Sequence, residues 1–325
     1  MANRAPEPIE AAARRRADAR AARDWATADE LRAEIEAGGW KVVDSGTDYR
    51  LEPAVLPDVE IGSEIRYGRS EAVPSRLDDA PTGLASVVLV ASSDPAETLR
   101  SLDALTATSP DGTDIVLVAD GLPDRALEGL RPDALAARSG APVELVRTSA
   151  VLGQAAALNA GIRRARAAVV IAIDPCVIVT GDVVTPLVRA LDDPTVAIAG
   201  PFGLSSANLR SFDEQVAQGR TPRDVAAVQG YLMAFRRADA IARGPLDEGF
   251  RYYRNLDIWW SLVLRDEGLQ IPPRRAVTVP GLAVERGEPS AWASTPAAER
   301  DRLSKRNFYR VLDRFRGGDH LAVAP

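Results

Sequence analysis

Acidic residues follow two of the most apolar runs in the chain. Asp174 comes directly after the run 167–173, and Asp120 comes directly after the run 114–119. An unbroken apolar run of this length is typical of a strand that is buried on both faces, as in the parallel sheet of an α/β domain. The end of such a strand lies at the carboxyl edge of the sheet, where open α/β sheets bind ligands. The two carboxylates therefore indicate a ligand site at this edge, although Asp120, which precedes Gly121, also suits a simple turn.

A third acid, Asp257, lies near the start of the apolar segment 255–265. This segment is predicted to be a helix that Gly268 closes. An acid at the start of a helix is often only a cap. The position of Asp257 at the start of a helix therefore does not by itself indicate a chemical role.

The composition limits the chemistry that the chain can carry. It has 325 residues and a formal net charge of −6, which disfavours nucleic-acid binding by the chain as a whole. His320 is the only histidine, so a histidine-based triad or a multi-histidine metal site is not expected. Cys176 is the only cysteine, which excludes an internal disulfide framework and favours a reducing compartment. No signal-peptide core or membrane-length apolar run occurs, so we expect a cytoplasmic protein, at most peripheral to the membrane.

The elements that would position these acids alternate between strand and helix. The helix before the strand 167–173 carries Leu158, Ile162 and Ala165 at helical spacing. Further apolar runs predict strands at 85–91, 114–119, 143–146 and 196–200. This alternation predicts an α/β domain with a mostly parallel sheet.

The order of these residues resembles that of family 2 glycosyltransferases, which have a GT-A fold. The family pattern runs from a glycine through Asn-x-Gly-Ile and a short basic helix to an apolar strand and Asp-x-Asp. It is matched, in order, by Gly153, Asn159, Gly161, Ile162 and Asp174. The segments 229–250 and 255–265 also resemble two later family segments. The resemblance covers about residues 84–316 and implies a GT-A fold, in which a Rossmann-like mixed sheet lies between helices.

This resemblance also implies an activity. Family members transfer a sugar from a nucleotide-sugar donor to an acceptor, and the resemblance implies inversion at the sugar carbon. Asp257 matches the aspartate that is the general base in the family. Asp120, Asp174 and Asn159 match donor-side positions. Nothing in the sequence selects the donor sugar, the nucleotide base or the acceptor.

The Asp-x-Asp motif is incomplete. In the family it holds Mg²⁺ or Mn²⁺, which neutralises the diphosphate leaving group. Here Asp174 remains, while Pro175 and Cys176 occupy the other two positions. Because hard cations prefer oxygen ligands, we expect only weak binding of Mg²⁺ or Mn²⁺ at Asp174. Basic side chains could supply the missing charge, and the candidates are Arg210, Arg220 and Arg306.

The N-terminal region has a different character. Residues 7–37 are rich in alanine, arginine and glutamate, and they predict one long helix or a helical hairpin. Its apolar stripe comprises Trp25, Ala28, Leu31 and Ile35. Two short strands are predicted to follow, at 40–43 and 49–51. The region resembles the C-terminal end of cysteinyl-tRNA synthetases, which belongs to their tRNA-recognition region, but it carries none of their catalytic or zinc-binding motifs.

These observations divide the chain into four parts. They are an α+β appendage over 1–52, a linker over 53–83, a glycosyltransferase-like domain over 84–316 and a tail over 317–325. Within the domain, the polar range 203–223 is expected to be a loop.

Four functions remain open. The first is an active inverting glycosyltransferase. The second is a degenerate glycosyltransferase-like protein that binds a nucleotide or partner without turnover, a hypothesis supported by Ala119, Pro175, Cys176 and Leu256 in place of the residues usual in the family. The third is an RNA-associated module acting through residues 1–52, where a solvated helix face or a dimer contact is the simpler interpretation. A nucleotidyltransferase is the fourth, although no basic glycine-rich signature supports it.

Overall fold

The computed structural model describes residues 5–45, 48–123, 140–216, 219 and 221–324. The chain is divided into two compact units, Met1–Arg69 and Ser70–Pro325. The described residues do not include Arg220, one of the candidate basic residues.

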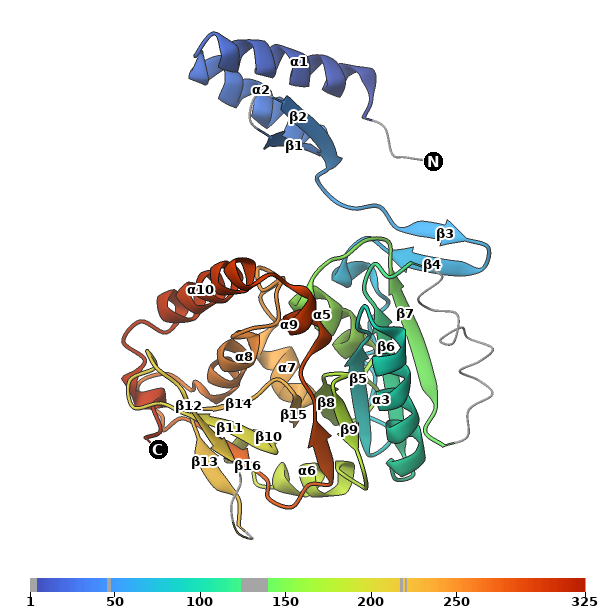
Figure 1. The fold of residues 1–325 in the computed structure, drawn as a ribbon, viewed down its shortest axis with the longest axis vertical. Coiled ribbons are helices and arrows are strands. Elements are labelled where there is room, and N and C mark those ends of the chain that lie inside the picture. Colours follow the sequence, from blue (N-terminus) through green and yellow to red (C-terminus); the bar gives the residue numbers. More distant parts are fainter. Residues whose placement is uncertain (1–4, 46–47, 124–139, 217–218, 220, 325) are drawn as a thin grey trace. The chain divides into compact units, whose positions relative to one another are not determined.

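The first unit begins with a helical hairpin followed by a β-hairpin (Figure 1). The helices are α1 (Glu7–Ala21) and α2 (Trp25–Ala37), and the strands are β1 (Trp40–Ser45) and β2 (Asp48–Pro53). The Asp24 side chain caps α2 by accepting a hydrogen bond from the Thr27 backbone N–H at 3.2 Å. This confirms the hairpin rather than the single helix. The small core consists of Ala12, Ala13, Leu31, Ile35 and Trp40.

Two side chains of this unit depart from simple expectations. Trp25 is 59% exposed, so only the Ala28, Leu31 and Ile35 part of the apolar stripe is buried. It is the first residue of α2, and the buried face of that helix begins one turn later, at Ala28. Arg16 is buried, and its guanidinium donates two hydrogen bonds to the Asp44 carboxylate at 2.9 and 3.0 Å.

A large mixed sheet forms the centre of the second unit (Figure 1). The strands of this sheet that belong to the second unit are, in spatial order, β13 (Arg223–Val225), β16 (Arg275–Thr278), β10 (Val196–Gly200), β15 (Leu232–Arg236), β8 (Val169–Ile173), β5 (Ala85–Val90), β6 (Thr113–Ala119) and β7 (Val143–Thr148). The neighbours β8, β5, β6 and β7 run parallel, and β10 runs parallel to β16. β15 is antiparallel to both β10 and β8. Every residue of β5, β8 and β10 is buried, as their unbroken apolar sequences predicted.

Helices cover both faces of the sheet. α3 (Pro95–Thr108) and α6 (Val184–Ala190) share one apolar core with Leu89 and Leu117 of the sheet. The opposite face is covered by α5 (Gln154–Arg164). A Cβ at Gly161 of α5 would lie only 2.3 Å from Val88 Cγ1, so a glycine is needed for this close approach. The remaining helices are η1 (Ser70–Ala72), α7 (Arg237–Arg243), α8 (Leu256–Arg265), α9 (Ser290–Ser294), α10 (Ala297–Arg314) and η3 (Asp319–Leu321).

Short strands occur where none was predicted. β11 (Phe202–Ser205) pairs with β12 (Asp213–Val216) and β14 (Ala227–Val228), so the range 203–223 is not simply a loop. β9 (Val177–Val179) pairs with β17 (Val284–Arg286). The range 53–83, expected to be a linker, contains the antiparallel pair β3 (Val59–Ile61) and β4 (Glu64–Tyr67). In the expected tail, Leu321 is fully buried and Val323 exchanges backbone hydrogen bonds with Ser206.

Candidate active site

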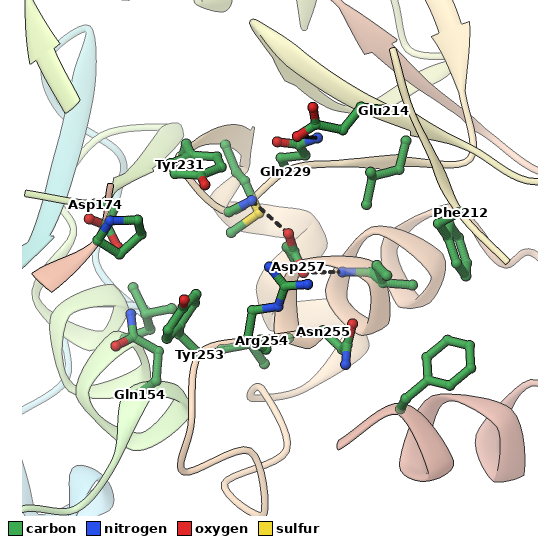
Figure 2. Close-up of a pocket in the computed structure, with 18 of the residues that line it drawn as sticks. Gln154, Asp174, Phe212, Glu214, Gln229, Tyr231, Tyr253, Arg254, Asn255 and Asp257 are labelled. Carbon is green, nitrogen blue, oxygen red and sulfur yellow. Dashed lines mark hydrogen bonds between the residues drawn. The ribbon is translucent and has the colours of Figure 1, made fainter. Parts of the chain in front are cut away.

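A cavity of about 360 Å³ lies beside the end of β8 and the start of α8. The segments 204–214, 229–233 and 253–258 supply most of its lining, together with Asp174 and Phe308. Figure 2 shows Asp257 near the middle of the lining, with Asp174 and Tyr231 on one side and Phe212 on the other. The structure therefore brings two of the four predicted site residues, Asp174 and Asp257, into one cavity. Asp120 and Asn159 do not line it.

Asp257 lies in the first turn of α8 and is oriented by two backbone N–H groups. Its Oδ2 accepts a hydrogen bond from Gly230 at 2.9 Å, and its Oδ1 accepts one from Ile258 at 2.9 Å. The bond from Gly230 comes from a distant segment, so Asp257 does more than cap its own helix. A Cβ at position 230 would lie 3.3 Å from the Asp257 Cβ, which is tighter than ordinary contact. Each carboxylate oxygen has two lone pairs, so both keep acceptor capacity for a ligand hydroxyl.

Burial sets the protonation behaviour of Asp257. It raises the pKa of this carboxyl, and the hydrogen bonds from Gly230 and Ile258 and the charge of Arg254 offset the rise only in part. A carboxylate with a raised pKa is a stronger base than one that is free in water. The site can therefore accept a proton from a bound hydroxyl group.

Asp174 lies at the end of β8, on the other side of the cavity from Phe212 (Figure 2). Its backbone N–H donates to the Tyr231 carbonyl at 2.9 Å, and its Oδ1 accepts from the Cys176 N–H at 2.9 Å. Burial raises the pKa of Asp174, while the hydrogen bonds from Cys176 act in the opposite direction. Burial and the neighbouring Asp174 raise the pKa of the Cys176 thiol.

These residues do not fit a tightly bound Mg²⁺ or Mn²⁺ ion. Asp174 Oδ1 already accepts a hydrogen bond in the turn, and the last position of the motif carries the soft thiol of Cys176, whose pKa burial raises. Hard cations need several oxygen ligands. Within the described part of the chain, no group of three or more His, Cys, Asp or Glu side chains is placed to hold a metal ion.

The Asp120 side chain stabilises the turn just before α5. Its Oδ1 accepts hydrogen bonds from the Leu152 N–H at 2.8 Å and the Thr148 hydroxyl at 2.9 Å, and its Oδ2 accepts one from the Gly153 N–H at 2.9 Å. These bonds fix the turn from which Gln154 enters the cavity lining. In the structure Asp120 is thus a turn residue, and its donor-binding role stays a prediction.

Asn159 is buried on α5 and connects that helix to the segment before α8. Its Oδ1 accepts from the Leu246 N–H at 2.9 Å, and its Nδ2 donates to the Leu246 carbonyl and to Glu248 Oε1, each at 2.9 Å. Both the oxygen and the nitrogen of its side-chain amide therefore have hydrogen-bond partners within the protein. Its donor-binding role likewise stays a prediction.

Several lining residues were not identified from the sequence. Arg254 projects beside Asp257 (Figure 2) and has no ion-pair partner among the described side chains. Tyr231 lies on the side of Asp174, and Gln229 lies beside Glu214. The segment 229–250 did carry a family signal, but that signal gave its side chains no individual roles.

The candidate basic residues are placed differently from one another. Arg210 lines the cavity. Arg306 does not, and its neighbour Asn307 donates hydrogen bonds to the carbonyls of Tyr252 and Arg254 at 2.8 and 2.9 Å. Asn307 of α10 thus holds the segment that leads into α8.

The far end of the cavity is apolar. Phe212 and Phe308 meet edge to face with ring centroids 6.4 Å apart, and Leu204 lies in the same lining. This end lies across Asp257 from Asp174 (Figure 2). The cavity therefore has a charged end and an aromatic end, with the half-buried carboxylate of Asp257 between them.

The mixed, mostly parallel sheet between helices defines this domain as a GT-A glycosyltransferase fold. Residues 86–232 match the family model described as glycosyl transferase family 2, which spans somewhat less than half of the chain. This match agrees with the resemblance found in the sequence.

The solved structures that resemble the chain include two glycosyltransferases. The crystal structure of GalNAc-T7 with UDP, GalNAc and Mn²⁺ has a TM-score of 0.58 and 17% identity, covering 72% of this chain and 48% of that one. The mannosyltransferase PcManGT from Pyrobaculum calidifontis, in complex with GDP-Man and Mn²⁺, has a TM-score of 0.48 and 18% identity over 77% of this chain and 71% of that one. The chain thus spans about half of the GalNAc-T7 structure, and at this identity the likeness concerns the fold.

A local similarity connects the chain to a different protein. The cysteine–tRNA ligase of Opitutus terrae is 49% identical over 49 residues, which are 15% of this chain and 11% of the ligase. The expected resemblance to cysteinyl-tRNA synthetases is therefore present over a short segment. Among the described residues, no helix has the length and apolar character to cross a bilayer.

Proposed function

We propose that the chain transfers a sugar from a nucleotide-sugar donor to an acceptor hydroxyl, with inversion, and that Asp257 is the general base. The observation that carries this proposal is the placement of Asp257 and Asp174 in one cavity of a GT-A fold. The family 2 match and the fold support the class of reaction. The orientation of the half-buried carboxylate and the rise that desolvation causes in its pKa support the role of Asp257.

The positions of Asp174, Asp257 and Phe212 suggest the course of the proposed reaction. The acceptor oxygen attacks the anomeric carbon from the face opposite the diphosphate, and its proton passes to Asp257. The bond between the anomeric carbon and the diphosphate oxygen breaks, its electron pair stays on that oxygen, and the nucleoside diphosphate leaves. Asp257 therefore has to lie between the donor end and the acceptor end, as it does between Asp174 and Phe212. Holding both reactants in line supplies a large share of such a rate enhancement.

The other predicted residues have supporting roles in this proposal. Asp174 marks the donor side and binds Mg²⁺ or Mn²⁺ weakly at most, because its surroundings offer too few oxygen ligands. Asp120 and Asn159 act on the donor indirectly, since they fix the two ends of the segment that carries Gln154 and Leu158 into the cavity. Phe212 and Phe308 form the acceptor side.

A second candidate function is a degenerate glycosyltransferase that binds without turnover. It is favoured by the thiol of Cys176 and by Ala119 and Leu256, which replace family acids. The two hypotheses differ in one measurable property. An enzyme hydrolyses its nucleotide-sugar donor slowly when no acceptor is present, whereas a degenerate protein binds the donor and leaves it intact.

Calorimetric titration with a panel of nucleoside diphosphates and nucleotide sugars, with and without Mn²⁺, is the first test. The best-bound donor is then incubated with wild-type protein and with Asp257→Asn, and release of nucleoside diphosphate is followed. Binding with release by the wild type, and binding without release by Asp257→Asn, is the expected result. Binding without release by both proteins would favour the degenerate scaffold.

A further inference from the structure

Arg286 lies beside the incomplete Asp-x-Asp turn although it is far away in sequence. It ends β17, which pairs with β9 so that Arg286 faces Val177 across the two strands. The next residue, Gly287, donates its N–H to the Cys176 carbonyl at 2.9 Å. This pairing anchors the backbone of Arg286 next to the position where the second acid of the motif is missing.

The Arg286 side chain contacts three residues of the cavity lining, although Arg286 itself is not one of the lining residues. Its guanidinium carbon lies 4.8 Å from the centroids of both the Phe202 and Tyr231 rings, which meet edge to face. Its Nη1 donates to Gln229 Oε1 at 3.1 Å and pairs with Glu214 Oε1 at 3.3 Å. Tyr231, Gln229 and Glu214 all line the cavity. Arginine favours aromatic faces and binds phosphate through two parallel N–H bonds.

The chemistry of the donor end requires a positive charge there. A leaving diphosphate gains negative charge as its bond to the sugar breaks, and that charge has to be neutralised. The carboxylate and thiol of Asp174 and Cys176 are a poor ligand set for a hard cation. The fixed guanidinium of Arg286 is the charge that the structure places next to this turn.

We infer that Arg286 binds the diphosphate of the donor and stabilises it as the leaving group, so that donor binding does not need a divalent cation. This inference rests on the proposed function. As the acceptor oxygen bonds to the anomeric carbon and Asp257 takes its proton, the electron pair of the breaking bond moves to the diphosphate oxygen. The Arg286 N–H groups donate hydrogen bonds to that diphosphate. Glu214, which is more exposed, is displaced from Arg286 when the diphosphate binds.

Calorimetry on the full chain tests this inference. UDP, GDP, ADP and CDP, and the nucleoside of whichever binds best, are titrated in EDTA and in Mn²⁺. We expect the preferred diphosphate to bind in EDTA within about threefold of its affinity in Mn²⁺. Arg286→Ala should weaken diphosphate binding about 10- to 100-fold and leave nucleoside binding unchanged, since only the charge-assisted bonds to phosphate are lost. Arg286→Lys, which keeps the charge without the planar fork, should fall between the two.

The matched control is Arg302→Ala. Arg302 also forms an exposed ion pair, with Glu299 of α10, but its partner does not line the cavity, whereas Glu214, the partner of Arg286, does. Diphosphate binding should be unchanged in this variant. Thermal unfolding of each variant shows whether it is folded. If Arg286→Ala does not fold, the affinity of Arg286→Lys for the diphosphate tests the inference instead.

The outcomes separate this inference from the proposed function. Diphosphate binding that requires Mn²⁺ and is unaffected by Arg286 substitutions would overturn the inference and leave the transferase proposal standing. Failure of every nucleotide to bind the folded wild type, with and without Mn²⁺, would overturn both.

Discussion

Asp257 shows how a single carboxylate acquires a chemical environment from its neighbours. The Gly230 N–H fixes one oxygen, the first turn of α8 fixes the other, and the lack of a side chain at Gly230 leaves room for the carboxylate. Burial then raises the pKa of the group. The segment resemblance identified Asp257 from sequence, but its hydrogen bond to Gly230 joins two segments that no local pattern connects.

The pH dependence of turnover tests the role of Asp257. A general base works only when deprotonated, so kcat/KM should fall as the pH falls through the raised pKa, which lies above the value of about 4 for a free aspartate. Asp257→Asn should lower kcat/KM about 10²- to 10⁴-fold and remove this acidic limb. The measurement is a pH profile of donor consumption for both proteins. An unchanged acidic limb in the variant would assign the titration to another group.

Asp44 provides a second test at the scale of one residue. The Arg16 guanidinium, which donates to this carboxylate, lowers the pKa of Asp44 to about 2, and Arg20 contributes to the shift. A lowered folded-state pKa stabilises the folded unit above the unfolded-state value of about 4, and this contribution is lost as the pH falls from about 4 to about 2. Because 34% of the Asp44 side chain is exposed, solvent screening reduces its worth to about 1 kcal/mol.

Asp44→Asn should therefore destabilise the first unit by about 1 kcal/mol at neutral pH. Hydrogen exchange of the β1 and β2 amides in the full chain measures this local stability. Glu30→Gln, which changes an exposed acid on α2, is the control. Equal protection in wild type and Asp44→Asn at neutral pH would show that the ion pair contributes nothing.

At the scale of elements, the long buried strands were predictable and the short ones were not. β8 and β10 carry no polar side chain, and β5 and β6 are apolar apart from Ser86, Thr113 and Asp114, so their burial could be predicted without knowledge of their partners. β9, β11, β12, β14 and β17 contain only two to four residues each, and their register is set by partners far away in sequence. The pairing of β17 with β9 determines the position of Arg286, so no local pattern could have indicated it.

The close packing of α5 on the sheet gives a prediction at this scale. Gly161→Ala would place a Cβ 2.3 Å from Val88 Cγ1 and 3.1 Å from Val118 Cγ2. Both valines belong to buried strands and cannot move freely, so we expect a loss of about 1–3 kcal/mol in the free energy of unfolding. Urea unfolding of the variant measures it.

A double-mutant cycle then identifies the cause. Val88→Ala removes the methyl group that the new Cβ would meet, so the combined variant should be more stable than the sum of the single effects predicts. Additive losses would mean that the glycine is needed for a reason other than its distance from Val88.

At the scale of the whole molecule, the two units differ in their part in the candidate active site. All residues that line the cavity belong to the second unit. In the first unit acidic residues outnumber basic ones over residues 1–52, and Arg16 and Arg20 are already paired with Asp44. RNA binding by this unit therefore stays a prediction that its charge disfavours, despite the local similarity to a tRNA ligase.

Removal of residues 1–52 tests whether the units act independently in donor binding. Because every lining residue remains in the truncated chain, its affinity for the preferred nucleoside diphosphate should stay within about twofold of the full-length value. Calorimetric titration of both proteins gives this comparison, and thermal unfolding shows whether the truncated chain is folded. A weaker affinity in a folded truncated protein would mean that the first unit takes part in the donor site. An unchanged affinity would leave this unit with a function separate from the binding of the donor.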